Sequence, residues 1–125
     1  MHIVSRFGVV FPDSIRIKVS LDTPERYASF TSPKPLVYFK DKMASYAQMN
    51  ERANRVANWF LPIGFQKGGK VAILLNNCLE WLYVWFGLAK IGVVAVPLNT
   101  QHKGSLLQYF INHCDARLIV IGSNL

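Results

Sequence analysis

Apolar residues recur along this chain with two periods that alternate from residue 36 onward. Uninterrupted apolar runs predict buried strands, and apolar spacings of three and four predict helices with one buried face. The predicted strands are residues 36–39, 71–75, 93–96 and 117–121, and the predicted helices run from Ser45 to Phe60, from after Asn77 to Ile91, and from Ser105 to His113. This order, with short connections, predicts an α/β fold: a partial open sheet, mostly parallel, with helices on both faces.

The first of these helices has the clearest start. Ser45-Tyr46-Ala47-Gln48 has the form of a capping box, in which the serine hydroxyl accepts from the third residue's N–H and the glutamine side chain reaches back. Glu51 and Arg55 are four residues apart, which predicts an ion pair on the solvent side of the helix. Pro62 and Gly64 are expected to end it.

The segment from Leu79 to Leu98 is long enough to be considered as a membrane-spanning helix, since its only charged residues are Glu80 and Lys90. Gly92 breaks it, however, and the β-branched run that follows differs in character from the aromatic run before. A buried helix followed by a buried strand fits this pattern better. We therefore expect no transmembrane segment.

Residues 1–34 are the hardest part of the chain to interpret. Residues 9–11 form a short apolar run, and Ile15, Ile17 and Val19 alternate with polar residues as in a strand. Thr23-Pro24 has the form of a helix start. We divide the chain into this N-terminal segment and an incomplete α/β subdomain at residues 35–125.

The composition excludes a disordered chain, because 51% of the 125 residues are hydrophobic and only 17% are charged. The formal net charge of +7 would suit a nucleic acid or an anionic membrane. The basic residues form scattered pairs, however, and no RNA-binding or zinc-ligand spacing is present. We expect a solvated surface and no nucleic-acid partner.

Two cysteines bear on the compartment. Cys78 and Cys114 are far apart and have apolar neighbours, which indicates free thiols under reducing conditions. The first 20 residues contain no apolar run long enough for a signal peptide. We expect a cytoplasmic protein, with peripheral contact with a membrane left open.

No residue pattern in the chain predicts catalysis or metal binding. Lys67-Gly68-Gly69-Lys70 precedes a strand, whereas a phosphate loop leads from a strand into a helix, so we interpret it as a surface turn. His113-Cys114-Asp115 are consecutive residues that point in different directions, so they indicate a helix end and not a catalytic triad.

Short motifs occur in a fixed order between Leu36 and Ile121. They are Ser45-Tyr46-x-Gln48-Met49-Asn50, Gly64-Phe65-x-x-Gly68, Asn77-x-x-Glu80-Trp81, Trp85-x-Gly87, Lys90-x-Gly92, Pro97-Leu98-Asn99 and Asp115-Ala116. Their order and spacing resemble the N-terminal part of the superfamily of acyl-CoA synthetases, peptide-synthetase adenylation domains and firefly luciferases. Within it, the sequence looks closest to fatty-acid-transport-type and carnitine-type CoA ligases. One departure is Gly69, where the family commonly has Asp.

The resemblance implies an ATP-dependent acid–thiol ligase, in which a carboxylate attacks the α-phosphate of ATP and the acyl group then passes to CoA. ATP, Mg²⁺, CoA and an acyl substrate are implied for the full-length member. In the family, the phosphate loop with its lysine and the C-terminal domain with its catalytic lysine lie beyond the position of Leu125. We therefore expect an N-terminal fragment that binds no cofactor and catalyses nothing alone. Its partner would be the remainder of the enzyme or a complementing chain.

Two candidate sites accompany this resemblance. Asn99 and Thr100 follow a strand at its carboxyl end, where open α/β sheets bind ligands, and in some family members this loop approaches the CoA tunnel. The alternative is that Asn99 satisfies backbone groups of its own loop. Trp85 is a candidate for the wall of the acyl pocket, with a place in the plain core as the alternative.

Two other interpretations remain open from the sequence. One is a stand-alone α/β module that docks onto another chain through its sheet edge. The other is a basic protein that binds a membrane surface or nucleic acid, for which a steep salt dependence of polyanion binding would be diagnostic.

Overall fold

The computed structural model describes residues 15–17, 32–123 and 125. The elements within these residues are β1 (Ile15–Ile17), β2 (Pro35–Phe39), β3 (Lys42–Ser45), α2 (Tyr46–Phe60), β4 (Lys70–Leu74), α3 (Leu79–Lys90), β5 (Val94–Pro97), α4 (Gly104–His113) and β6 (Leu118–Ile121). The strand suggested by alternation at Ile15 and Ile17 is confirmed as β1. The run at residues 9–11, Val19 and the helix start at Thr23 lie outside the described residues.

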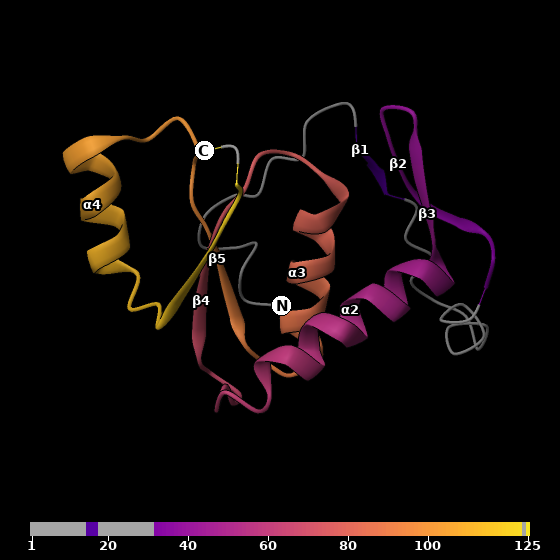
Figure 1. Ribbon diagram of the computed structural model, residues 1–125, viewed down its shortest axis with the longest axis horizontal. Coiled ribbons are helices and arrows are strands. Elements are labelled where there is room, and N and C mark those ends of the chain that lie inside the picture. The colour runs from indigo at the N-terminus through magenta and orange to yellow at the C-terminus, as the bar shows by residue number, and fades with distance from the viewer. Residues whose placement is uncertain (1–14, 18–31, 124) are drawn as a thin grey trace.

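A three-stranded parallel sheet forms the centre of the α/β part, with the strand order β5-β4-β6. In Figure 1 this sheet lies between α4 and α3. Val71 and Ile73 of β4 belong to the core that includes α2 and α3. Ala72 and Leu74 belong to a second core, against which residues of α4 pack. Helices therefore cover both faces of the sheet, and the α/β prediction is confirmed.

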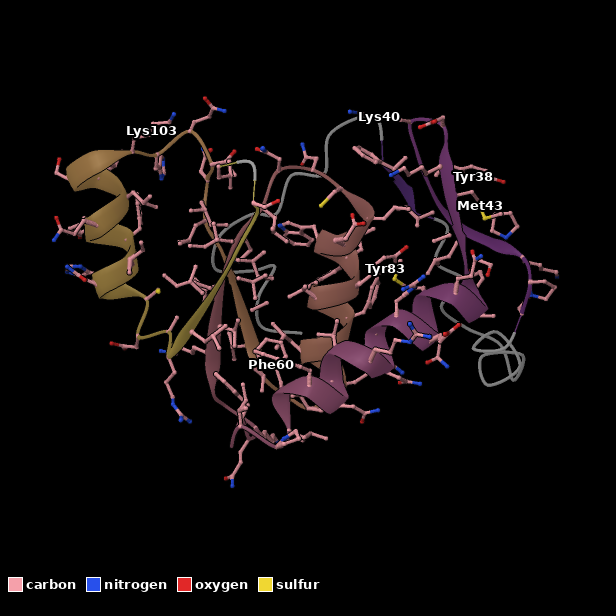
Figure 2. The ribbon with its side chains drawn as sticks, in the orientation of Figure 1. Tyr38, Lys40, Met43, Phe60, Tyr83 and Lys103 are labelled. Carbon is pink, nitrogen blue, oxygen red and sulfur yellow. The ribbon has the colours of Figure 1, made fainter. Side chains whose placement is uncertain are left out.

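A second, antiparallel sheet has the order β1-β2-β3. The predicted strand at residues 36–39 is present as β2, but it does not join the parallel series. It turns through Lys40, whose φ is 54°, and Asp41, and then pairs with β3, a strand that was not predicted and whose last residue, Ser45, is the predicted start of the helix. Figure 2 shows Tyr38 and Met43 on this hairpin, where they are cross-strand partners with exposed side chains.

The predicted capping box at the start of α2 is confirmed. The Ser45 Oγ accepts from the Gln48 N–H at 3.1 Å, and the Gln48 Oε1 accepts from the Ser45 N–H at 2.9 Å. These reciprocal bonds satisfy two backbone donors that a helix start would otherwise leave without a partner. The predicted Glu51–Arg55 pair is also present, with 2.6 Å between Oε1 and Nη2.

The face that α3 buries is wider than the aromatic stripe predicted from the sequence. Leu79, Leu82, Trp85, Gly87 and Leu88 are buried, whereas the predicted stripe residues Trp81 and Ile91 are only partly buried. The reason is that α3 packs against the sheet on one side and against α2 on the other. A helix held between two neighbours buries more than one stripe.

Gly87 allows α2 and α3 to approach closely. A Cβ atom at this position would lie 2.6 Å from the Val56 Cβ and 2.8 Å from the Ala53 carbonyl oxygen. The second contact is with helix backbone, which cannot rotate away as a side-chain end can. The glycine is therefore required by the spacing between the two helices and not by backbone conformation.

We predict that Gly87→Ala destabilises the fold by about 1–3 kcal/mol, because it overpacks the α2–α3 contact. In a helix without such a contact, the same substitution would stabilise by roughly 1 kcal/mol, so the sign is diagnostic. The measurement is the free energy of unfolding in urea. Gln108→Ala, an exposed position on α4, is the control and should change it little. A gain in stability for Gly87→Ala would contradict the close approach.

Candidate functional site

The carboxyl ends of the three parallel strands lie at the same edge of the sheet, and polar residues follow each strand. Asn76 and Asn77 come after β4, Asn99 and Thr100 after β5, and Ser123 after β6. Ligands of open α/β sheets bind outside this edge. Of these residues, only Asn99 and Thr100 were predicted as a site, although the two consecutive asparagines after a buried strand carried a similar signal.

Asn99 is exposed and takes part in the hydrogen bonding of its own loop. Its Oδ1 accepts from the Gln101 N–H at 2.9 Å, and its carbonyl oxygen accepts from the His102 N–H at 3.1 Å. These bonds are those expected if Asn99 satisfies loop backbone groups. Thr100 beside it is half-buried. A contact of either residue with CoA stays a prediction.

Trp85 lies in the core on α3 and is only 6% exposed. Its ring packs against Trp81, with centroids 5.8 Å apart, and against Phe86, with centroids 5.1 Å apart. This is the environment that the core alternative describes. Trp85 is therefore buried in the core, whereas Asn99 is exposed in a loop. A role for Trp85 in lining an acyl pocket stays a prediction.

Two titratable groups near the start of α3 are held in their protonated forms. Burial, and to a smaller extent the Glu80 carboxylate, raise the pKa of the Cys78 thiol above its ordinary value. The same two causes raise the pKa of the Tyr83 phenol. Figure 2 shows Tyr83 on α3, on the side facing α2. Neither group is poised to act as a nucleophile or a base at neutral pH.

The turn at residues 67–70 and the helix end at residues 113–115 are both held by local hydrogen bonds. Gly68, with φ of 88°, donates its N–H to the Gly92 carbonyl at 2.9 Å, at the amino end of β4 and away from the polar edge. At the end of α4, the His113 Nδ1 lies 2.9 Å from the Tyr109 carbonyl oxygen and the Cys114 thiol donates to the Ile111 carbonyl. The predicted turn at residues 67–68 and the predicted helix end at His113 are therefore confirmed.

The part of the chain that the structure describes contains neither a metal-ligand cluster nor a membrane-spanning helix. Within residues 15–17, 32–123 and 125, no group of three or more His, Cys, Asp or Glu side chains is placed to hold a metal ion. Over the same residues, no helix has both the length and the apolar character that crossing a bilayer requires. The polar residues after the three strands offer amide and hydroxyl groups, which can bind and orient a ligand by hydrogen bonds.

A family match and the similarity to curated proteins indicate the same family for this chain. Residues 24–125 match the family described as AMP-binding enzyme. The crotonobetaine/carnitine–CoA ligase of Proteus mirabilis is 45% identical over 85 residues, which make up 68% of this chain and 16% of that relative. The chain thus spans about one sixth of the length of the curated relatives it matches.

Solved structures agree with the sequence matches. A Mycobacterium tuberculosis fatty acyl CoA synthetase is similar with a TM-score of 0.62 and 34% identity, over 66% of this chain and 16% of that one. An anthranilate CoA ligase in complex with anthranoyl-AMP is similar with a TM-score of 0.63 and 30% identity, over 67% of this chain and 16% of that one.

We predict that Cys78 reacts with iodoacetamide more slowly than an unstructured cysteine peptide at neutral pH, because the raised pKa leaves little thiolate. The rate is measured by mass spectrometry in the Cys114→Ser variant, from neutral to alkaline pH. The pKa of the Cys78 thiol is higher in the folded than in the unfolded state. The stability that the protonated thiol contributes is therefore fully present below the pKa of the unfolded thiol. This contribution is lost as the pH rises through the pKa of the folded thiol. Cys78→Ser should remove the part of the alkaline loss of stability that the thiol causes, while the part caused by Tyr83 remains. Equal rates for protein and peptide at every pH would contradict the assignment.

Proposed function

We propose a function for this chain from its family: it belongs to the AMP-binding enzymes. The proposed function is that of the N-terminal part of an ATP-dependent acyl-CoA ligase. The family match over residues 24–125 carries the proposal. The similar proteins named above are CoA ligases and synthetases in each case. These matches give no support to the alternative of a stand-alone interaction module.

The reaction proposed for the full-length protein joins a carboxylic acid to CoA by way of an acyl-adenylate. ATP, Mg²⁺ and CoA are its cofactors, and groups outside residues 1–125 supply the phosphate loop and the catalytic lysine. The part described here supplies the scaffold and one edge of the ligand site. We infer that the isolated chain neither adenylates a carboxylate nor transfers an acyl group.

A carnitine-type substrate is the finer form of this proposal. Its support is the 45% identity to the Proteus mirabilis enzyme, whose name specifies crotonobetaine and carnitine. A fatty acid is the competing acyl substrate, because a fatty acyl CoA synthetase is among the similar structures. Crotonobetaine and carnitine carry a permanent positive charge and fatty acids do not, so the two classes need different pockets.

The state of the two cysteines bears on the compartment in which the proposed ligase acts. Cys78 and Cys114 are both free thiols in the structure, as is usual for proteins of the cytoplasm. We infer that the ligase acts in the cytoplasm, and peripheral contact with a membrane remains compatible with the basic charge.

We expect the full-length gene product to form acyl-CoA from ATP, CoA and a carboxylate, and the 125-residue chain to form none. The assay measures pyrophosphate release and acyl-CoA by mass spectrometry with carnitine, crotonobetaine and fatty acids in parallel. A higher kcat/KM for the trimethylammonium substrates supports the finer proposal, and a higher value for fatty acids replaces it. A full-length product that adenylates no carboxylate would contradict the function.

We also predict that Asn99→Asp weakens the use of CoA without affecting adenylation. The aspartate keeps an oxygen that can accept from the Gln101 N–H, so the loop is retained, but its charge repels the phosphates of CoA. The KM for CoA should rise about tenfold, equivalent to about 1.4 kcal/mol, while ATP–pyrophosphate exchange stays unchanged.

Asn112→Asp is the matched control, because Asn112 is an exposed asparagine on α4. This variant should change neither reaction. If Asn99→Asp also leaves the KM for CoA unchanged, Asn99 orders its loop and does not border the CoA path.

A further inference from the structure

The connection between β5 and α4 is anchored at both of its ends. At its start, the Leu98 N–H donates to the Ile73 carbonyl of β4 at 2.8 Å. At its end, the half-buried His102 stacks its ring on the Phe110 ring of α4, with 4.8 Å between the ring centroids and 9° between the ring planes. Residues 99–101 lie between these two anchors, at the polar edge of the parallel sheet.

Phe110 attaches this ring stack to the sheet. Leu107, Phe110 and Ile111 are the partly buried residues of α4. They pack against the core that contains Ala72 and Leu74 of β4. α4 has no fully buried residue, so its attachment to the sheet is shallow. The stack with His102 therefore adds to that attachment, and it joins the end of the connection to β4 by way of α4.

The hydrogen bonds within the connection are weaker constraints than the ring stack. Asn99 accepts from the Gln101 and His102 N–H groups, but Asn99 is exposed, so water competes for both bonds. Lys103, the N-cap residue of α4 (Figure 2), makes no side-chain capping bond. Two stacked rings exclude water from the faces that they share, and aromatic pairs of this kind stabilise beyond the area that they bury. The stack is therefore the contact that most restricts the conformation of the connection.

We propose that His102 is a positioning residue for CoA in the full-length ligase. Its ring, held on Phe110, keeps Asn99 and Thr100 in the conformation in which they border CoA. This inference rests on the proposed function, in which the loop after β5 lies beside CoA. The nearly parallel ring planes mean that the contact uses the face of the imidazole and not its nitrogen atoms. A phenylalanine at position 102 can therefore take over this role, and an alanine cannot.

The test compares His102→Ala with His102→Phe in the full-length protein. Without the stack, fewer molecules hold the loop in the competent conformation, and the apparent affinity for CoA falls by that fraction. His102→Ala should therefore raise the KM for CoA about two- to tenfold, the range expected for one aromatic pair. Saturating CoA selects the competent conformation, so kcat should stay unchanged, as should ATP–pyrophosphate exchange. His102→Phe should restore the wild-type KM.

α4 offers a matched control in its second histidine. His113 lies in the last turn of α4, away from the connection, and its ring stacks on Tyr109 with 4.0 Å between the centroids. His113→Ala removes a contact of the same kind and should leave the KM for CoA unchanged. Hydrogen exchange of residues 99–103, measured by mass spectrometry, should be faster in His102→Ala than in the wild type, and this readout does not depend on activity.

The partner ring supplies an independent check. Phe110→Leu keeps an apolar side chain against the core but removes the ring on which His102 stacks. In the Phe110→Leu background, His102→Ala should raise the KM for CoA no further, because the stack is already lost. Additive rises in KM would give the two residues separate roles and would contradict the inference.

Three further results would overturn the inference. An unchanged KM for CoA in His102→Ala, with or without faster exchange, would show that the stack orders the loop without serving CoA. An equal rise in His102→Ala and His102→Phe would assign the effect to the imidazole nitrogens. An equal rise in His113→Ala would assign it to α4 as a whole. An active enzyme with any of these results removes this inference alone, whereas a wild-type protein that forms no acyl-CoA removes the proposed function and this inference with it.

Discussion

The burial of β4 on both faces is the constraint on which the rest of this structure depends. Val71, Ala72 and Ile73 have no exposed surface, and β4 is the only described strand that pairs with two others in the parallel sheet. Val71 and Ile73 belong to the core on the side of α2 and α3, and Ala72 belongs to the core on the side of α4. A charged side chain at any of these positions would be placed in one of the two cores without a partner, at a cost that a domain of this size cannot offset.

The position of β4 also determines what each edge of the sheet does. Because its neighbours run parallel to it, the loops after β4, β5 and β6 lie together and bring Asn76, Asn99 and Ser123 to one edge. The amino edge carries tight turns, such as the bond between the Gly68 N–H and the Gly92 carbonyl. The structure thus separates a polar edge suited to ligands from an edge devoted to chain reversal. In the proposed ligase, the polar edge is the part of the described chain that is best placed to border a ligand.

The sequence predicted the parts of the fold that local patterns determine. The predicted strand at 71–75 and the observed Lys70–Leu74 differ by one residue at each end, because an apolar run without alternation identifies a strand buried on both faces. The capping box at Ser45 was likewise predictable, since both of its partners lie within four residues. The fixed motifs from Ser45 to Asp115 led to the correct family.

Features that depend on distant segments were not predictable in the same way. β3 pairs with β2 through a two-residue turn, but with only Met43 and Ala44 as apolar residues it has too short a pattern to be identified as a strand from the sequence. The apolar groove that Val56, Trp59 and Phe60 of α2 form with β6 brings together segments that are far apart in the sequence, so no local pattern predicts it. For Asn99 the sequence supplied two alternatives, and the bond to the Gln101 N–H supports loop ordering without excluding a contact with CoA.

The central claim is that these 125 residues are the first part of a longer ligase, and the intact mass of the native gene product tests it most directly. We expect a protein several times heavier than the 14.2 kDa of this chain, with these residues at its N-terminus. A native product of 14.2 kDa, isolated from cells without covalent continuation, would contradict the account.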